Sequence, residues 1–229
     1  MGGAITMNQT SSLQAVLFDL DGVITDTAEY HYLAWNAIAE ELGIPFSREF
    51  NENLKGVSRM DSLKLLLSQA PTPPSYTEEE LDQLADRKNK LYQELIDKVT
   101  PADLLPGIAD FIADIKRHGV KMGLASASKN ALAVISRLGI ADQFDVIVDA
   151  AKLKNNKPDP EIFLTGAAAL NADPKYCIGV EDAVAGVDAI KAAGMFAVAI
   201  GSPAAFPHAD LVLESTSQLR FEDLAKRFT

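Results

Sequence analysis

Two aspartates separated by one residue stand at the end of an apolar segment near the start of the chain. Residues 15–20 form an expected strand, and Asp19 and Asp21 are followed directly by Gly22. Residues two apart point to the same side of a strand, so two carboxylates would reach one spot. Adjacent carboxylates repel each other unless a cation or a proton lies between them. The pair therefore indicates a metal site, a general acid/base or both, whereas a turn built on aspartate chemistry would explain only one of them.

Two later segments carry groups that could hold an anion. Ser126 and Lys129 lie between an expected strand and an expected helix. A hydroxyl, an ammonium group and helix N–H groups can bind phosphate there, and a plain serine N-cap is the alternative. Lys157 is either a fixed cation or an ordinary surface lysine. The bond between Lys157 and Pro158 is a candidate cis peptide.

A second acidic pair, Glu181 and Asp182, follows another apolar run. Carboxylates, together with water and phosphate oxygens, suit the octahedral coordination that Mg²⁺ demands. The alternative is that Asp182 simply caps the helix that follows. Zinc is not expected, because the three histidines are scattered and the single cysteine has no ligand-like spacing.

The elements that must position these residues alternate between strands and helices. Expected strands occupy residues 15–20, 121–126, 144–149, 176–181, 196–200 and 210–214. Expected helices occupy residues 107–118, 129–138, 160–170 and 183–193. Most of the strands lack polar alternation, which is typical of parallel strands covered on both faces. The alternation predicts a doubly wound α/β fold, and all the polar segments above would lie at the carboxyl edge of its sheet, where such folds bind ligands.

The segment 28–99 interrupts this alternation with helical patterns only. The expected helices cover about residues 30–42, 58–69 and 77–98. Thr77 and Glu80 have the spacing of a capping box. We expect three parts: a leader over 1–12, a core domain over 13–27 and 100–229, and an inserted helical cap domain over 28–99. A helical module placed directly after Asp19 and Asp21 could close over them.

The composition restricts the partners of the protein. The 229 residues include 21 basic and 32 acidic ones, for a net charge of −11. Such an acidic surface disfavours nucleic acid and anionic membranes, so an anionic substrate would need a local cationic pocket. No apolar run approaches the roughly 20 residues of a membrane span, and residues 1–12 do not resemble a signal peptide. The single cysteine, Cys177, is expected to be a small buried apolar group, and we expect a protein of the reduced cytoplasm.

Carboxylates, a serine, lysines and helix N-termini at one sheet edge are the parts that phosphoryl transfer requires. An aspartate nucleophile would form an aspartyl phosphate. The chain resembles the haloacid dehalogenase superfamily of phosphotransferases in Asp19-Leu20-Asp21-Gly22-Val23, Ser126, Lys157 and Glu181-Asp182. Longer stretches narrow the resemblance to the sugar phosphomutases of that superfamily: residues 21–31, 55–59 and 126–130. The resemblance implies an α/β, doubly wound, Rossmann-like core with an inserted all-α cap.

The resemblance also implies roles for residues of the core. Asp19 would be the nucleophile and Asp21 the general acid/base. Mg²⁺ would be held by the Asp19 carboxylate, the Asp21 main-chain carbonyl, Glu181 and Asp182. The transferring phosphoryl group would be held by Ser126 and Lys157, with Ala127 and Asn130 in the same phosphate-binding loop.

On the cap side, the resemblance implies that Arg59 clamps the distal phosphate, because its planar fork can bind phosphate bidentately. Lys129 would lie beside that phosphate. A sugar-specificity loop would contain Lys55, Gly56, Val57 and Ser62. Without the resemblance, Arg59 and Lys55 would be interpreted as ordinary surface charges.

Three further cap residues have implied roles. His31 and Lys88 would couple cap closure to the placement of Asp21, although the pattern around Lys88 alone predicts a solvated helix face. Trp35 would pack inside the cap and could also form part of the substrate wall.

The implied reaction is the interconversion of β-D-glucose 1-phosphate and D-glucose 6-phosphate. It would proceed through phospho-Asp19 and β-glucose 1,6-bisphosphate, with Mg²⁺ as cofactor and a small sugar phosphate as the only expected partner. The alternative within the same superfamily is a sugar-phosphate phosphatase that uses water as acceptor. A non-catalytic phosphosugar-binding protein is disfavoured because both aspartates and the acidic pair are present. We expect a monomer, since the cap must move freely.

Overall fold

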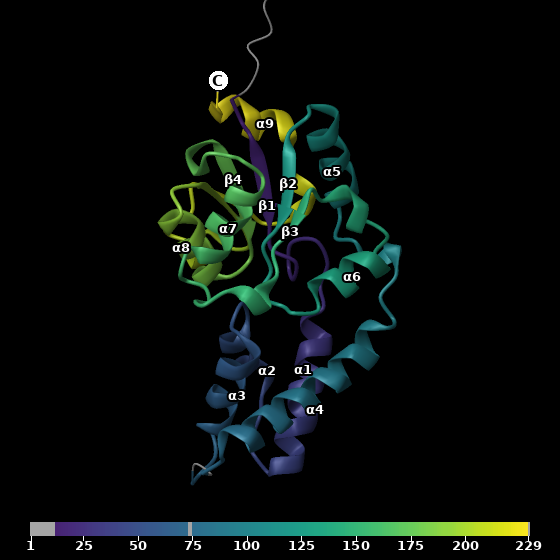
Figure 1. Ribbon diagram of the computed structural model, residues 1–229, viewed down its shortest axis with the longest axis vertical. Helices are drawn as coiled ribbons and strands as arrows, with labels where there is room; N and C mark the ends of the chain where they lie inside the picture. Colours follow the sequence, from purple (N-terminus) through teal and green to yellow (C-terminus); the bar gives the residue numbers. More distant parts are fainter. Residues whose placement is uncertain (1–11, 73–74, 229) are drawn as a thin grey trace, which may run out of the picture.

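Six parallel strands form a single sheet in the computed structural model, which describes residues 12–72 and 75–228 (Figure 1). The strands are β1 (Ala15–Phe18), β2 (Lys121–Leu124), β3 (Val146–Ile147), β4 (Cys177–Glu181), β5 (Phe196–Ile200) and β6 (Leu211–Leu213). Their order across the sheet is β3-β2-β1-β4-β5-β6. From β1 the chain adds β2 and β3 on one side of the sheet, and then β4, β5 and β6 on the other. The order of the strands therefore reverses between β1 and β4, and sheets of this kind bind ligands at such a reversal. The predicted doubly wound α/β fold is confirmed.

The predicted strands are all present but several are shorter. β1 ends at Phe18, where it pairs with Leu124 on one side and Val180 on the other. Asp19 therefore lies just beyond the strand, although its N–H still donates to the Val180 carbonyl at 3.0 Å. β3 has only two residues and, as an edge strand, pairs only with β2. Asp19, Asp21 and Asp182 thus stand just beyond strand ends, while Glu181 is the last residue of β4.

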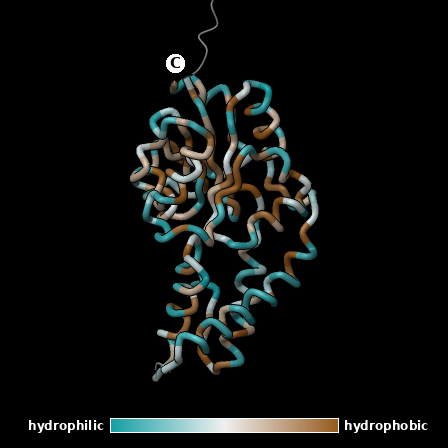
Figure 2. Tube along the Cα trace, in the orientation of Figure 1, coloured by the Kyte–Doolittle hydropathy of each residue, from teal (hydrophilic) through white to brown (hydrophobic). Residues whose placement is uncertain are grey.

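Helices cover both faces of the sheet. The core helices are α5 (Ile108–Arg117), α6 (Ala131–Arg137), α7 (Glu161–Ala169), α8 (Val184–Ala192) and α9 (Phe221–Ala225). Residues of α5, α6 and α9 pack with Val16 and Phe18 on one face, while residues of α7 and α8 pack with Ala15 and Leu17 on the other. Figure 2 shows hydrophobic residues concentrated along the strands between these layers. This two-sided burial explains why the strands lack polar alternation.

Four helices lie apart from the sheet, below it in Figure 1. They are α1 (Ala28–Leu42), α2 (Arg48–Asn51), α3 (Arg59–Leu67) and α4 (Glu78–Ile96). The predicted capping box of Thr77 and Glu80 is present at the start of α4, and Gly43 ends α1 with a φ of 66°. These helices enclose an apolar cluster of their own, which includes Trp35 and Leu63. None of the helices in residues 12–72 and 75–228 is long and apolar enough to cross a membrane.

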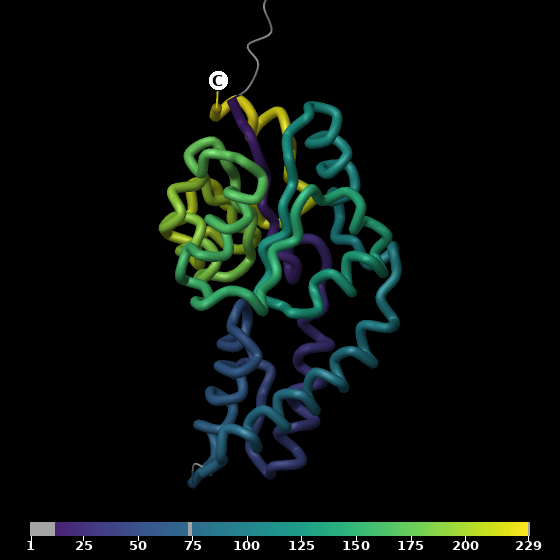
Figure 3. The backbone as a smooth tube through the Cα atoms, in the orientation of Figure 1, coloured from purple at the N-terminus to yellow at the C-terminus, as the bar shows by residue number. Residues whose placement is uncertain are grey.

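Two chain segments connect these four helices to the sheet, and they are bonded to each other (Figure 3). Thr25 forms an isolated antiparallel bridge with Leu104, and its hydroxyl donates to the Asp103 carbonyl at 2.7 Å. The Leu105 N–H donates to the Ile24 carbonyl at 2.9 Å. The predicted division into 1–12, 13–27 with 100–229, and 28–99 remains a prediction; of the leader, only residue 12 is among the described residues.

Candidate active site

Lys157 occupies the centre of the acidic cluster at the carboxyl edge of the sheet. Its ammonium lies 2.8 Å from Asp19 Oδ1 and 2.5 Å from Glu181 Oε1. Only 1% of its side chain is exposed, so it is a fixed buried cation and not a surface lysine. The predicted cis peptide between Lys157 and Pro158 is present. Burial opposes the charge of Lys157, but the two carboxylates outweigh it and raise the pKa of the ammonium.

Three carboxylates converge in a way that suits a divalent cation. Asp19, Glu181 and Asp182 each offer an oxygen, and these oxygens lie within 4.8 Å of one another. Burial, followed by repulsion from Glu181 and Asp19, raises the pKa of Asp182 to about 8. Burial also raises the pKa of Asp19 to about 7, in spite of Lys157. The three carboxylates carry more negative charge than the single ammonium of Lys157 compensates, so the cluster favours a further cation. Because all the donor atoms are oxygens, Mg²⁺ fits the cluster.

Two glycines allow the carboxylates to lie this close to the backbone. A Cβ atom on Gly22 would lie 2.0 Å from Asp182 Oδ2, and Gly22 has a φ of +72°. A Cβ atom on Gly186, in the first turns of α8, would lie 1.9 Å from Glu181 Oε1. The other Glu181 oxygen accepts from the N–H groups of Asp182 and Ala183, at 2.9 and 3.0 Å. Glu181 therefore holds the two residues that lead into α8 and faces the acidic cluster at the same time.

The Asp21 carboxylate lines the cavity and is held by residues at the entry to the four-helix unit. Its Oδ1 accepts from the Thr27 N–H at 3.0 Å and from the Thr27 hydroxyl. Its Oδ2 lies 3.6 Å from His31 Nε2. Burial raises the pKa of Asp21, but the donors on His31 and Thr27 outweigh this effect and hold that pKa below its usual value. Asp21 is thus ionised and hydrogen-bonded, as a base must be before it accepts a proton.

The partly exposed His31 and the buried Lys88 form a pair behind Asp21. The Lys88 ammonium lies 2.8 Å from His31 Nδ1 and 4.9 Å from the centre of the Trp35 ring. Burial and repulsion from Arg59 lower the pKa of Lys88 to about 7. The helix-face pattern predicted a solvated Lys88; that prediction is wrong, because only 3% of the residue is exposed. The pattern failed because the lysine faces the boundary between helical unit and core.

A cavity of about 210 Å³ lies between the sheet edge and the four helices. Both Asp19 and Asp21 line it, and Asp182 does so as well. The other predicted site residues that line it are Ser126, Ala127, Lys129, Asn130, Arg59, His31, Trp35, Lys55, Gly56, Val57, Ser62 and Lys88. Glu181 and Lys157 do not line it and lie buried beneath Asp19. The structure therefore brings together core and cap residues that are far apart in the sequence.

Cationic side chains line the cavity on the side of the helical unit, where Arg59 and Lys55 lie. At the other end Lys157 lies buried beneath Asp19 and compensates part of the carboxylate charge there. Arg59 Nη1 lies 3.9 Å from Asp86 Oδ1, and Lys55 Nζ lies 2.8 Å from Glu52 Oε2. This arrangement provides the local positive charge that an anionic substrate needs within an acidic protein.

Sequence reasoning missed several residues of the site. Among the cavity-lining residues these include Asn51, Ser58, Ser128 and Asn156. Two more, Thr27 and Tyr92, hold the groups around Asp21 without lining the cavity. The signal in the sequence was position: Thr27 stands shortly after Asp21, and Ser128 lies within the predicted phosphate-binding loop.

The class of protein follows from a comparison of this sequence with models of known protein families. A family model described as haloacid dehalogenase-like hydrolase matches residues 13–194. The match includes both acidic pairs, Ser126 and Lys157. The chain belongs to this family.

Individual relatives narrow the match. Beta-phosphoglucomutase of Bacillus subtilis is 52% identical over 210 residues, which are 92% of this chain and 93% of that protein. A crystal structure of beta-phosphoglucomutase from Clostridium difficile is 51% identical with a TM-score of 0.92, covering 94% of this chain and 97% of the other. A less similar relative, the phosphorylated carbohydrates phosphatase of Thermotoga maritima, is 31% identical over 80% of this chain and 82% of its own. Within its family, the chain groups with the beta-phosphoglucomutases.

Proposed function

We propose that the protein is a Mg²⁺-dependent β-phosphoglucomutase that interconverts β-D-glucose 1-phosphate and D-glucose 6-phosphate. The observation that carries this proposal is the 52% identity to a beta-phosphoglucomutase over nearly the whole chain. The geometry supports it, because one cavity joins a carboxylate nucleophile at the sheet edge to Arg59 on the cap. A substrate that carries phosphate at either end can lie across such a cavity in two orientations.

Asp19 is the nucleophile in this proposal. Its carboxylate oxygen attacks phosphorus, the bond from phosphorus to the sugar oxygen breaks, and phospho-Asp19 forms. Lys157 and Ser126 hold the transferring phosphoryl group. Mg²⁺, held by Asp19, Glu181, Asp182 and the Asp21 carbonyl, would neutralise the developing phosphate charge. The carboxylate cluster around Asp19 and Asp182 supports such a site through its donor set and its uncompensated negative charge.

Asp21 carries the proton between the two half-reactions. When phospho-Asp19 transfers its phosphoryl group, Asp21 removes the proton from the attacking sugar hydroxyl and β-glucose 1,6-bisphosphate forms. The bisphosphate then binds in the opposite orientation and returns its other phosphate to Asp19. Protonated Asp21 gives its proton to the leaving sugar oxygen, so atoms and protons balance over the cycle.

Residues 28–99 act as the cap in this proposal and keep water from phospho-Asp19. Hydrogen bonds already link the helical unit to the core: Asn156 Nδ2 donates to Asp61 Oδ2 at 3.1 Å, and Asn130 Nδ2 donates to Asn89 Oδ1 at 2.8 Å. His31 on α1 and Lys88 on α4 approach Asp21 from the cap, so closure would place the base. Excluding water favours transfer to the bound sugar over hydrolysis.

The product formed from anomerically pure β-glucose 1-phosphate tests the proposal. With Mg²⁺ and a trace of β-glucose 1,6-bisphosphate, the enzyme should produce glucose 6-phosphate with little inorganic phosphate. Stoichiometric release of inorganic phosphate would instead support a phosphatase, the activity named for a relative that is 31% identical. Asp19→Asn should abolish turnover, and mass spectrometry of trapped enzyme should find the acyl phosphate only when Asp19 is present.

A further inference from the structure

Tyr92 is a fully buried phenol of α4 that has no part in the proposed reaction as described so far. Its hydroxyl lies 3.0 Å from Thr27 Oγ1, and Thr27 in turn bonds to Asp21 Oδ1 through both its hydroxyl and its N–H. The Tyr92 ring stacks on the His31 ring, with centroids 4.0 Å apart and planes 24° apart. One side chain therefore touches both groups that face the Asp21 carboxylate.

The direction of the hydrogen bonds along this chain follows from elementary chemistry. An ionised carboxylate can only accept, so the Thr27 hydroxyl must give its single proton to Asp21. The Thr27 oxygen can then only accept from Tyr92, whose hydroxyl must be the donor. Burial raises the pKa of Tyr92, so the phenol keeps this proton at any working pH. Donors connected in this way polarise one another in a buried site.

Tyr92 is held by packing as well as by these polar contacts. It packs in the core apolar cluster together with Ile96 and Ile24, although it belongs to a helix of the cap region. The Lys88 ammonium also lies over its ring, at 4.8 Å. Its place beneath Thr27 and His31 is therefore set by packing and not by those contacts alone.

We propose that Tyr92 is a positioning residue for Asp21. Its hydroxyl fixes the rotamer of Thr27, its ring fixes the plane of His31, and together these hold the Asp21 carboxylate in one orientation towards the sugar hydroxyl. The inference rests on the proposed function, because it concerns the proton transfer assigned to Asp21. Reacting groups must be held to within a fraction of an ångström for such a step to be fast.

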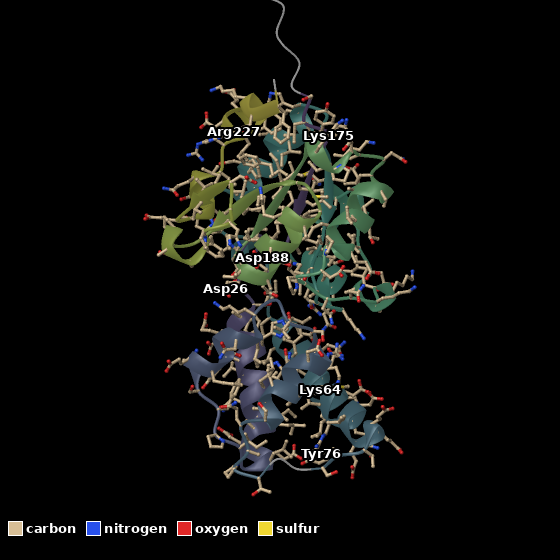
Figure 4. All side chains as sticks on the ribbon, turned by 90° about the vertical axis from the view of Figure 1, so that its left-hand side faces the viewer. Asp26, Lys64, Tyr76, Lys175, Asp188 and Arg227 are labelled. Atoms are coloured by element: carbon tan, nitrogen blue, oxygen red, sulfur yellow. The ribbon has the colours of Figure 1, made fainter. Side chains whose placement is uncertain are left out.

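Tyr92→Phe removes the hydroxyl and keeps the stacked ring. We expect kcat for conversion of β-glucose 1-phosphate to fall about tenfold while KM changes less than about twofold, since the lost contact affects the transition state and not binding. Tyr76→Phe is the matched control, because Tyr76 lies at the far end of the helical unit (Figure 4) and does not line the cavity. An unchanged kcat in Tyr92→Phe would overturn the proposal.

A double-mutant cycle tests the route through Thr27. In a Thr27→Val background the hydroxyl chain is already broken, so adding Tyr92→Phe should lower kcat by less than about twofold. Fully additive losses would show that Tyr92 acts on stability or packing and would overturn the positioning role. The effect of Tyr92→Phe on kcat is measured against the Thr27→Val protein itself, so a lower melting temperature of both variants does not affect the result. A wild-type enzyme that fails to convert β-glucose 1-phosphate would contradict the proposed function instead, which keeps the two failures distinct.

Discussion

At the scale of single residues, Lys157 is the group on which the acidic cluster depends. Its ammonium bridges Asp19 and Glu181 with almost no exposure to solvent. Removing one partner of a buried ion pair leaves an uncompensated charge, which costs about 3–5 kcal/mol.

Lys157→Met should therefore lower the free energy of unfolding by about 3–5 kcal/mol in the metal-free protein, and abolish turnover. Urea denaturation monitored by circular dichroism measures the first effect. Lys152→Met is the control, because Lys152 is exposed and its contact with Asp149 contributes about 0–1 kcal/mol. Equal stabilities of the two variants would show that Lys157 does not stabilise the cluster.

The raised pKa values of Asp182, to about 8, and Asp19, to about 7, predict how metal binding depends on pH. Both carboxyls bind protons in the metal-free protein below these values, and Mg²⁺ must displace those protons. Affinity for Mg²⁺ should therefore rise from about pH 6 to about pH 9, by up to about tenfold per pH unit for each proton released. Isothermal titration calorimetry at several pH values measures this, and an affinity independent of pH would contradict it.

The same shifts predict the stability of the metal-free protein. A carboxyl whose pKa is higher in the folded than in the unfolded state binds more protons when folded, so its contribution to stability falls as pH rises between the two values. Thermal unfolding without Mg²⁺ should show the melting temperature falling as pH rises towards about 8. Added Mg²⁺ should raise the melting temperature again. A melting temperature that instead rises with pH over this range would contradict the raised pKa values of Asp19 and Asp182.

At the scale of elements, the start of α8 must approach Glu181 so closely that only glycine fits. Alanine in place of glycine within a helix usually stabilises by about 0.5–1 kcal/mol. At Gly186 the added Cβ would instead collide with the Glu181 carboxylate at 1.9 Å.

Gly186→Ala should thus weaken Mg²⁺ binding about tenfold or more, because Glu181 must move. Gly194→Ala is a suitable control: Gly194 has a φ of +76°, but a Cβ atom added there would meet no other atom within 4 Å. The control should lose about 1–2 kcal/mol of stability through backbone strain and keep its Mg²⁺ affinity. The same affinity in both variants would mean that Glu181 does not depend on this contact.

At the scale of the whole molecule, core and helical unit meet across the cavity through a few side-chain contacts. The hydrogen bond from Asn156 to Asp61 is exposed, and such bonds contribute about 0.5–1.5 kcal/mol. If this contact favours the closed form, its loss should admit water more often.

Asn156→Ala should accordingly raise the inorganic phosphate released per turnover by about twofold to fivefold, with the mutase rate falling by a similar factor. The neighbouring Asn155→Ala is the control, since Asn155 is exposed and contacts Glu161 on its own side of the cavity. Phosphate release and glucose 6-phosphate formation are measured in parallel assays. If both variants gave the same ratio of inorganic phosphate to glucose 6-phosphate, Asn156 would not contribute to closure of the cap.

The comparison of sequence and structure shows which information is local. The apolar runs predicted the six-stranded core because burial on both faces leaves a clear pattern, and Asp19 and Asp182 were found because they end such runs. The helix pattern by itself placed Lys88 on a solvated face and pointed to no role for Tyr92, because the burial of both residues arises where α4 meets the core. That contact joins residues 65 positions apart, Thr27 and Tyr92, and no pattern within one helix contains it.

The bridge between Thr25 and Leu104 has a consequence for substrate choice. Because the two connecting segments are bonded to each other at this point, we expect the helical unit to turn about it, whereas a sideways shift would break the bridge. Such a turn would bring Arg59 back to the same place relative to Asp19. The enzyme would in this way measure molecular length: a hexose bisphosphate that spans the two groups is accepted in either direction, and a shorter triose phosphate leaves one end unbound.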